Sequence, residues 1–577
     1  MRALYLCLGL LVIGCGSSDE DGDGFAADVD CDDSNAAVHP DADERCNAID
    51  DNCDAEIDND PIDGVTWIAD EDGDGFGGAY AACAMPTGVT IVQRGGDCLD
   101  SNAMVFPGSR ALEVPGDGID TDCDGNDVCT DLNCDGMPDV VVPSHHDGDY
   151  AVTQPARLLS GLGGWGLDSV PTPMSGTLGV AVGDLNNDGY PDIVHASYHD
   201  GTSVNTDSFV YWGPKHAPAM RAGLPTHGAH WACIGDLDDN GYADIVFANH
   251  TDGATNDTES YIYWNRAGAF SPTDRVALIT RGATHCSIDD LNDDGRKDIV
   301  FSNFASGGSY ALDSYVYWGH VDGYSPAHRT DLPTMGTYAH TIADVNSDGR
   351  KDLVFWSHRD ADDHLTAANY IYWNRPEGGA TGFRPSDRTA FESMGGVRGE
   401  IADVNGDGFN EIIAPGFYAG AWTTVASSYV YWGNAQSAFS AMNRTTLMMT
   451  GARTAIVDDI NNDTYKDLLF TAHYDGDSFA PSMIFWGTAG GTFNNTNRLE
   501  LPGYHVTNGA GVVDFNHDGF KDIFLPGYHN NATGADATPW ANESFSRIYW
   551  GSATGLSATF FDEWPTRGAW SAAIVGR

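Results

Sequence analysis

The sequence predicts an all-β protein built mainly as a β-propeller of about eight four-stranded blades. One loop pattern, Asp-x-Asn/Asp-x-Asp/Asn-Gly-x-x-Asp/Glu, recurs eight times with small variations, starting at residues 131, 184, 236, 290, 344, 403, 459 and 514. The spacing of 52 to 59 residues lies in the range of propeller and solenoid repeats. Short runs rich in β-branched and aromatic residues surround the loops, as expected for strands.

The chain begins with an export signal. Arg2 precedes an apolar run, residues 3–13, which is too short to span a membrane as a mature helix. Val12-Ile13-Gly14-Cys15 resembles a bacterial lipobox, which implies a signal peptide over residues 1–15 and a lipid on Cys15. An ordinary signal peptide cut nearby is the alternative. We therefore expect an exported protein, either a lipoprotein of the bacterial outer membrane and cell surface or a secreted protein, with membrane contact only through the lipid.

Residues 16–128 form a second region, which contains two diverged Asp/Gly/Cys-rich units at about 19–60 and 68–128. Glu20–Phe25 recurs as Glu71–Phe76, and Asp30–Asn35 recurs as Asp97–Asn102. Apolar runs are few, so we expect disulfides and metal ions to stabilise a small, loop-rich domain. Carboxylates at alternate positions are suited to one cation in each unit, and they are Asp19, Asp21, Asp23, Asp70, Asp72 and Asp74. The two units resemble the MopE-type metal-binding repeat of bacterial surface proteins.

Cysteines concentrate in this region. Eight lie between Cys31 and Cys134, and their pairing is left open because eight cysteines allow many connectivities. The first unit lacks the spacer that carries Cys83, and the second has no counterpart of Cys46. We expect Cys233 and Cys286, far downstream, to be buried free thiols.

Residues 129–577 carry the eight repeats. Each repeat shows a strand before the loop, one after it and a third with Tyr-x-Tyr-Trp-Gly/Asn, and a weaker fourth strand completes a blade. No strand precedes the first loop, whereas residues 568–576 form a strand at the end of the chain. If this last strand completes the first blade, the ring closes with eight blades; seven blades with ragged ends is the alternative.

Each loop offers oxygen ligands to Ca²⁺. Side-chain oxygens fall at positions 1, 3, 5 and 9, position 7 offers its carbonyl, and glycine at position 6 permits the positive-φ turn. Position 12 is a strand residue rather than glutamate, which excludes an EF-hand. Solvated acidic turns are the alternative, but eight turns at one period favour ion binding. The candidate ligands are Asp131, Asn133, Asp135, Asp139, Asp184, Asn186, Asp188, Asp192, Asp236, Asp238, Asn240, Asp244, Asp290, Asn292, Asp294, Asp298, Asp344, Asn346, Asp348, Asp352, Asp403, Asn405, Asp407, Glu411, Asp459, Asn461, Asp463, Asp467, Asp514, Asn516, Asp518 and Asp522.

These loops and the blade period resemble the FG-GAP or VCBS repeat family, which includes the integrin alpha-chain propeller. The resemblance covers residues 129–577, although the Phe-Gly…Gly-Ala-Pro strand signature is absent. It implies a propeller stabilised by several structural Ca²⁺ ions, often on cell surfaces and often binding proteins or glycans.

A second set of residues repeats six positions after each position-9 carboxylate. We expect these side chains at the rim opposite the Ca²⁺ loops, near the mouth of the central channel, where they either cap the core between blades or bind a ligand. They are His145, Tyr198, His250, Phe304, His358, Phe417, His473 and Tyr528.

Charge and motifs narrow the function. A net charge of −56 argues against nucleic acid and anionic membranes as partners, and bound cations would account for many of the acids. No nucleophile elbow, zinc-protease motif or phosphate-binding loop occurs, so we expect no enzyme. The sequence favours a surface binding or adhesion module for an extracellular glycan or protein. A structural surface protein without a small ligand and a propeller enzyme are the alternatives. The ligand's identity and the oligomeric state stay open.

Overall fold

The computed structural model of this chain describes residues 19–576 with internal gaps. The gaps are residues 60, 86, 108, 110–118, 122, 124–128, 135, 146–153, 156, 161–165, 169–172, 175, 361–366, 376–381, 418–425, 437–438, 474–479, 529–543 and 567. The proposed signal peptide and Cys15 therefore lie outside the described residues. The chain divides into two compact units, residues 1–111 with 119–126, and residues 112–118 with 127–577.

The N-terminal unit contains little regular structure. Its one sheet has the order β2-β1-β3 and is antiparallel, with β1 at Val65–Asp70, β2 at Gly78–Ala82 and β3 at Thr90–Ile91. Three disulfides hold the loops: Cys31–Cys53, Cys46–Cys83 and Cys98–Cys123. Stacked ring pairs provide small cores, with Phe25 on His39 and Phe76 on Phe106. Disulfides thus replace the hydrophobic core that the sequence cannot supply.

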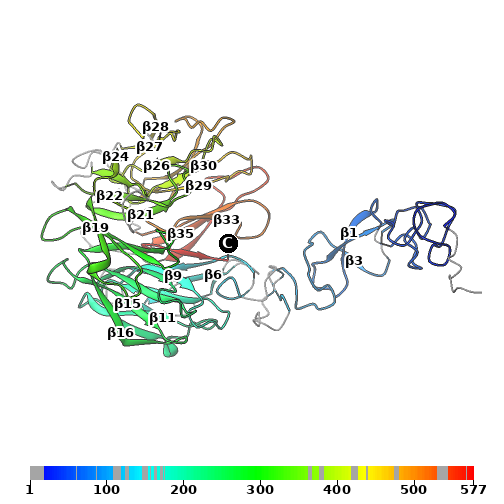
Figure 1. Cartoon of the computed structure of the whole chain (residues 1–577), viewed down its shortest axis with the longest axis horizontal. Helices are drawn as coiled ribbons and strands as arrows, with labels where there is room; N and C mark the ends of the chain where they lie inside the picture. The colour runs from blue at the N-terminus through cyan, green and yellow to red at the C-terminus, as the bar shows by residue number, and fades with distance from the viewer. Residues whose placement is uncertain are drawn as a thin grey trace, which may run out of the picture. The chain divides into compact units, whose positions relative to one another are not determined.

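The second unit is a ring of eight four-stranded antiparallel sheets (Figure 1). Blade 1 combines β37 (Ala573–Val575), β4 (Asp139–Val142), β6 (Arg157–Ser160) and β7 (Gly166–Asp168). The other blades each use four consecutive strands. They are β9 (Thr177–Gly183), β10 (Asp192–Ser197), β11 (Asn205–Tyr211), β12 (Ala222–His227); β13 (Ala229–Gly235), β14 (Asp244–Asn249), β15 (Glu259–Asn265), β16 (Phe270–Ile279); β17 (Ala283–Asp289), β18 (Asp298–Asn303), β19 (Ala311–Tyr317), β20 (Arg329–Met335); β21 (Thr337–Ala343), β22 (Asp352–Ser357), β23 (Ala368–Tyr372), β24 (Arg388–Glu392); β25 (Glu400–Ala402), β26 (Glu411–Ala414), β27 (Ser427–Tyr431), β28 (Arg444–Met448); β29 (Ala452–Asp458), β30 (Asp467–Ala472), β31 (Ser482–Phe485), β32 (Arg498–Leu501); and β33 (Gly511–Val513), β34 (Asp522–Leu525), β35 (Ser544–Tyr549), β36 (Phe561–Thr566).

Few elements lie outside the blades. Strands β5 (Gln154–Pro155) and β8 (Pro173–Met174) form a separate two-stranded ribbon. The only helical turns among the described residues are the 3-10 turns η1 (Pro218–Met220) and η2 (Pro326–His328). The prediction of an all-β propeller is therefore confirmed. Within the described ranges, no helix has the length and apolar character needed to cross a membrane.

The ring closes through the last strand of the chain. Ile574 of β37 pairs with Val140 of β4, so the C-terminal strand supplies the innermost strand of blade 1. Val140 also packs in one hydrophobic cluster with Phe524 and Ile548 of blade 8, while Val141 packs against blade 2. Blade 1 is thus buried on both faces, and the structure has eight blades rather than seven.

Neighbouring blades are joined by a repeated tyrosine. Tyr263 of β15 donates a hydrogen bond from its hydroxyl to the carbonyl of Pro225 in the preceding blade, at 2.6 Å. Tyr317 and Tyr372 do the same for Ile279 and Pro333 at 2.7 and 2.5 Å. These are tyrosines of the Tyr-x-Tyr-Trp motif, so the motif both fills the blade core and links each blade to the one before it.

One cysteine prediction is wrong. Cys233 and Cys286 form a disulfide between β13 and β17, the innermost strands of two adjacent blades, instead of remaining free thiols. Their distance in sequence, 53 residues, is one repeat period, which places equivalent positions of neighbouring blades side by side. Cys129 and Cys134 form another disulfide at the first loop.

Candidate metal centres

The propeller loops fold around their own carboxylates. In the loop that starts at Asp184, Asp184 Oδ2 accepts a hydrogen bond from the N–H of Gly189 at 2.8 Å, and Asn186 Oδ1 accepts one from Asp188 at 3.1 Å. Asp188 Oδ1 accepts one from Tyr190 at 3.0 Å. This pattern turns the side chains at positions 1, 3 and 5 toward one centre. The loops that start at residues 290, 344, 403, 459 and 514 repeat it.

The position-9 carboxylate connects the loop to the blade. Asp298 is fully buried, and its Oδ2 accepts the N–H of Leu291, position 2 of the same loop, at 2.9 Å. Its Oδ1 accepts the N–H of Gly319, which follows Trp318 just after the end of the third strand β19, at 2.8 Å. The carboxylate therefore clamps loop, second strand and third strand together. Equivalent pairs of bonds are made by Asp192, Asp244, Asp352, Glu411, Asp467 and Asp522.

This clamp explains a motif whose role the sequence did not reveal. A Cβ atom on Gly319 would lie 2.5 Å from the carbonyl oxygen of Lys297, so glycine permits the close approach of the chains in this blade. Where asparagine replaces glycine, as in Asn265, the side chain donates from Nδ2 to the carbonyl of Leu185 at 2.6 Å. The Gly/Asn after the tryptophan is thus part of the loop's support rather than only a turn residue.

Burial raises the pKa of the position-9 acids well above the ordinary value of a carboxyl group. Burial, partly offset by the two backbone N–H donors, raises the pKa of Asp298 to about 7, and the nearby carboxylates of Asp294 and Asp290 raise it further. The same causes raise the pKa of Asp192, Asp244, Asp352, Glu411 and Asp522 to about 7 and that of Asp467 to about 6. Without a counterion, the ionised loop is therefore electrostatically unfavourable at neutral pH.

The residues present fit a hard divalent cation. Every side-chain atom that could ligate a metal at positions 1, 3, 5 and 9 is a carboxylate or amide oxygen. No imidazole or thiolate occurs at these positions. Oxygen-only donor sets favour Ca²⁺ or Mg²⁺ over copper and zinc, and loop carbonyls and water can complete the six to eight ligands that Ca²⁺ takes. A cation at the loop centre would also neutralise the charge that raises the position-9 pKa.

Two loops depart from the pattern. Thr464 occupies position 6 with φ of 77°, a conformation that glycine adopts in the other loops, yet its N–H still donates to Asp459 at 2.8 Å. Glu411 reaches the clamp position with one more methylene, and its bond to Gly433 is longer, at 3.2 Å. Asp135, position 5 of the first loop, lies outside the described residues.

The N-terminal unit holds a different carboxylate arrangement. The candidate ligands Asp70, Asp72 and Asp74 do gather, but they do so with Asp97 and Asp100 from the following segment. The Oδ2 atoms of Asp72, Asp74 and Asp97 are buried without a hydrogen-bond donor. In the first unit, Asp19, Asp21 and Asp23 lie together, and the Oδ2 atoms of Asp21, Asp23 and Asp30 are buried without a donor in the same way.

These orphaned oxygens indicate a cation in each unit. Burial is the largest cause that raises the pKa of Asp74 and Asp97, and neighbouring carboxylates add to it. Buried acceptors with no donor are unfavourable unless a cation takes the donor's place. Asp30 and Asp97 were not among the predicted ligands, although their shared position next to the first cysteine of each unit is visible in the sequence.

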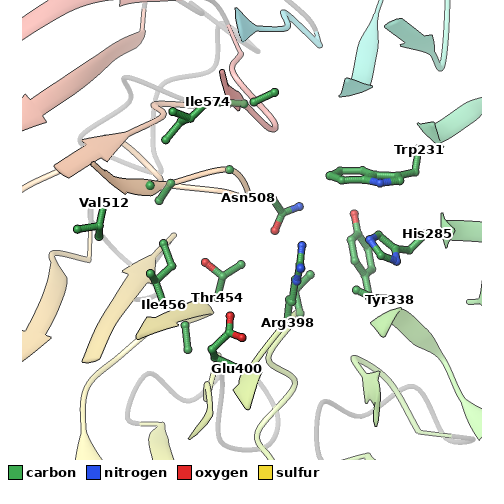
Figure 2. Close-up of a pocket in the computed structure, with 18 of the residues that line it drawn as sticks. Trp231, His285, Tyr338, Arg398, Glu400, Thr454, Ile456, Asn508, Val512 and Ile574 are labelled. Atoms are coloured by element: carbon green, nitrogen blue, oxygen red, sulfur yellow. The ribbon is translucent and has the colours of Figure 1, made fainter. Parts of the chain in front are cut away.

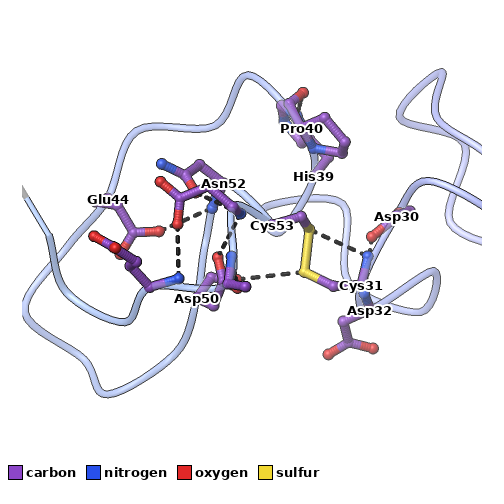
Figure 3. Close-up of a disulfide and its surroundings, with 12 residues drawn as sticks. Asp30, Cys31, Asp32, His39, Pro40, Glu44, Asp50, Asn52 and Cys53 are labelled. Atoms are coloured by element: carbon purple, nitrogen blue, oxygen red, sulfur yellow. Dashed lines mark hydrogen bonds between the residues drawn. A yellow bond between two sulfur atoms is a disulfide. The ribbon is translucent and has the colours of Figure 1, made fainter.

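A further loop of the propeller type lies in the first unit and was also missed. Asp50 accepts the N–H groups of Asp54 and Ala55 at 3.2 and 2.9 Å, and Asn52 accepts that of Asp54 at 3.0 Å, as in the blades. Figure 3 shows this loop beside the Cys31–Cys53 disulfide, with Glu44 accepting the N–H of Asn52 at 2.9 Å. The signal that would have found it is Asp-x-Asn-x-Asp at residues 50–54, with Ala55 in the place of glycine.

The second predicted set forms a closed ring. Each of the eight aromatic or histidine side chains contacts the next, with ring centroids 5.7 to 6.4 Å apart, and Tyr528 returns to His145. Inside the ring, Tyr338 contacts Phe304 and His358, and Trp570 contacts His145 and Tyr528. The Arg453 guanidinium lies 4.8 Å from the Trp570 ring. The ring thus surrounds a filled centre, and ligand binding by it stays a prediction.

Comparisons with known proteins support the same architecture. The FG-GAP-like repeat family matches residues 131–195, 236–301, 290–355, 344–414 and 459–525, and the MopE-type metal-binding motif matches residues 30–59 and 97–127. Human integrin alpha-6 is 34% identical over 148 residues, which are 23% of this chain and 13% of the integrin. This chain therefore spans only a small part of that relative.

Two solved structures overturn one expectation. The periplasmic gluconolactonase of Pseudomonas aeruginosa has a TM-score of 0.37 at 12% identity, covering 67% of this chain and 98% of its own. A protein of Bacteroides uniformis described as a 6-phosphogluconolactonase has a TM-score of 0.36 at 12% identity, covering 69% and 98%. The expectation that the chain is no enzyme was wrong to rest on missing motifs, because these neighbours are enzymes, and we withdraw it. The likeness is too distant to assign their reactions here.

The family matches, taken together, span more than half of the chain and coincide with the loops described above. Five of the eight loops begin a matched segment. The remaining three show the same two-bond clamp of the position-9 carboxylate as the matched loops that start at residues 236, 290, 344 and 459. The chain belongs to the FG-GAP-like repeat family.

Proposed function

We propose that this chain is an exported binding module whose propeller is held in shape by Ca²⁺. The observation that carries the proposal is the buried position-9 carboxylate, which links each oxygen-lined loop to the core of its blade. A cation in such a loop stabilises the blade directly. Calcium is therefore structural, and the ligand is a glycan or protein outside the cell.

Location follows from the same features. The five disulfides require an oxidising compartment, and millimolar Ca²⁺ is typical outside the cytoplasm. The similarity to an integrin alpha chain, a protein with FG-GAP-like repeats, supports an extracellular role. Anchoring through a lipid on Cys15 completes the proposal.

The test is a metal count followed by a ligand screen. Elemental analysis of the purified mature chain should find about eight Ca²⁺ ions in the propeller and about two more cations in the N-terminal units. Fewer than about five ions would contradict the proposal. Glycan and protein arrays, read with and without a chelator, then identify the ligand. A folded, calcium-loaded chain that binds nothing on either array would instead favour a purely structural surface protein.

A further inference from the structure

A cavity of about 600 Å³ lies at the centre of the propeller. Its wall is made by the innermost strands or the segments leading into them, namely β13, β17, β21, β25, β29, β33 and β37. This volume is within the range of pockets that enclose small molecules. All the residues that line it belong to the described part of the chain.

The cavity is closed at one end and open at the other. In β17, the first four residues are buried and the last three are half-exposed, and β9 and β29 show the same gradient. The buried end is the end of the aromatic ring, where His230 contacts the Tyr338 hydroxyl at 3.0 Å. The half-exposed end of each strand runs directly into a metal loop. The cavity therefore opens on the face that carries the metal loops, opposite to the rim for which the sequence left core capping and ligand binding as alternatives.

One cation in the cavity makes no direct polar contact through its side chain with any described residue. Arg398 is exposed toward the cavity, and among the described residues its guanidinium makes no ion pair and no hydrogen bond (Figure 2). Asp458 on the same wall is already offset by Lys521 at 3.6 Å and Lys466 at 4.0 Å. The guanidinium is thus open to direct contact with a ligand, although Glu400 on the same wall acts on it electrostatically and the chain as a whole carries −56.

Oxygen acceptors without donors lie near this arginine. Asn508 points toward Arg398 in Figure 2, and its Oδ1 is buried with no hydrogen-bond donor. Glu400 is half-buried and accepts the N–H of Ile401 at 3.4 Å, its one hydrogen bond among the described residues, and the charge of Arg398 acts on it electrostatically. Such acceptors are satisfied by hydroxyl groups of a ligand.

Two further walls of the cavity are aromatic and aliphatic. Trp231, Tyr338 and His285 form an aromatic wall, and Ile456, Val512 and Ile574 form an aliphatic wall across the cavity (Figure 2). Trp231 is half-buried and contacts His285 at a centroid distance of 5.2 Å. A half-exposed indole offers a flat face for the C–H groups of a sugar ring.

We propose that this cavity binds a sugar acid, a small polyol with one carboxylate, with the carboxylate on Arg398 and the hydroxyls on Asn508 and Glu400. One guanidinium can pair with one carboxylate through two parallel hydrogen bonds. A phosphate monoester is less suited, because its second charge would face Glu400 and Asp458 without a second free cation. The inference rests on the proposed function as a binding module and gives that module a ligand class and a place.

The experiment is calorimetric titration of the calcium-loaded mature chain with D-glucuronate and D-galacturonate. Glucose, galactose and glucose 6-phosphate are the comparison ligands. We expect saturable binding of at least one hexuronate and at least about tenfold weaker binding of the neutral sugars and of the phosphate ester, because a charge-assisted pair is lost or a charge is left unpaired. Arg398→Gln should weaken hexuronate binding about tenfold or more, and Arg398→Lys should weaken it less.

Arg384→Gln is the matched control, since Arg384 is exposed and lies outside the cavity. It should leave binding unchanged. Wild-type protein that carries its Ca²⁺, melts cooperatively and binds no hexuronate up to about 10 mM would overturn the inference while leaving the calcium proposal intact. Equal binding by Arg398→Gln and wild type would overturn it as well. A wild-type chain that holds fewer than about five Ca²⁺ ions would instead refute the proposed function.

Discussion

The raised pKa of the position-9 carboxylates predicts that calcium stabilises the propeller more strongly as pH rises. A group such as Asp298 has an ordinary pKa of 3.8 and a pKa of about 7 in the folded, cation-free chain. Between these values the folded chain holds a proton that the unfolded chain has lost, so its free energy of unfolding falls as pH rises. A bound cation favours the ionised form and removes this loss.

The magnitude follows from linkage. Each such group changes the free energy of unfolding by about 1.4 kcal/mol per pH unit between about pH 5 and pH 7. With an unfolding entropy of about 2.1 cal/mol/K per residue, a propeller of this size shifts its melting temperature by about 1.5 °C per group and pH unit. The seven groups together set an upper limit of about 10 °C per pH unit, reached only if all blades unfold as one.

The assay is thermal unfolding in chelator and in excess Ca²⁺ at several pH values from 5 to 8.5. The difference between the two melting temperatures should grow with pH and level off above about pH 8. Buried histidines change the pH dependence of stability in the opposite direction, because burial lowers their pKa values, as for His340 to about 3. Their contribution is the same with and without Ca²⁺, so it cancels in the difference between the two melting temperatures. A difference that is the same at pH 5 and pH 8 would refute the reasoning. Asp298→Asn removes one titrating group and should reduce the pH dependence by about one seventh.

Further predictions follow from single contacts. Thr464→Gly should raise the free energy of unfolding by about 0.5–1 kcal/mol in denaturant titration, because Thr464 has a φ of 77°, whereas the control Gly295→Ala, with φ of 83° and open space around it, should lower it by a similar amount; equal effects of one sign would argue against backbone strain. Replacing Cys233 and Cys286 by alanine should lower the free energy of unfolding by about 2–4 kcal/mol, since the bond closes a loop of 53 residues, and a thiol assay of the unfolded wild-type chain should find neither cysteine reactive before reduction. Asp97→Asn should remove one cation in elemental analysis without changing the melting of the propeller, because Asp97 belongs to the carboxylate cluster of the N-terminal unit; an unchanged metal count would remove Asp97 from the site.

Local pattern was enough to predict most of the fold. The period of the Asp-rich loops set the number of blades, because each loop is a hairpin turn and one hairpin stands in each blade. The missing strand before Asp131 and the extra strand at the C-terminus predicted closure, since an unpaired sheet edge is unfavourable. The candidate ligands of each loop were also readable, because residues one to nine positions apart are brought together by a single turn.

What the sequence could not provide are contacts between residues far apart in the chain. Cys233 meets Cys286, and Asp97 joins Asp72 and Asp74, only because folding places equivalent strands or neighbouring loops side by side. The Gly/Asn after each tryptophan looked like a turn, and its N–H donation to the buried acid of the same blade became visible only in three dimensions. The central cavity is the extreme case, since Trp231, Arg398 and Asn508 come from three blades and share no motif. Sequence by itself determined the repeat, the turn chemistry and the oxygen-bearing side chains of the loops, which are local; the tertiary structure alone decided which end of the channel is open and which guanidinium faces it.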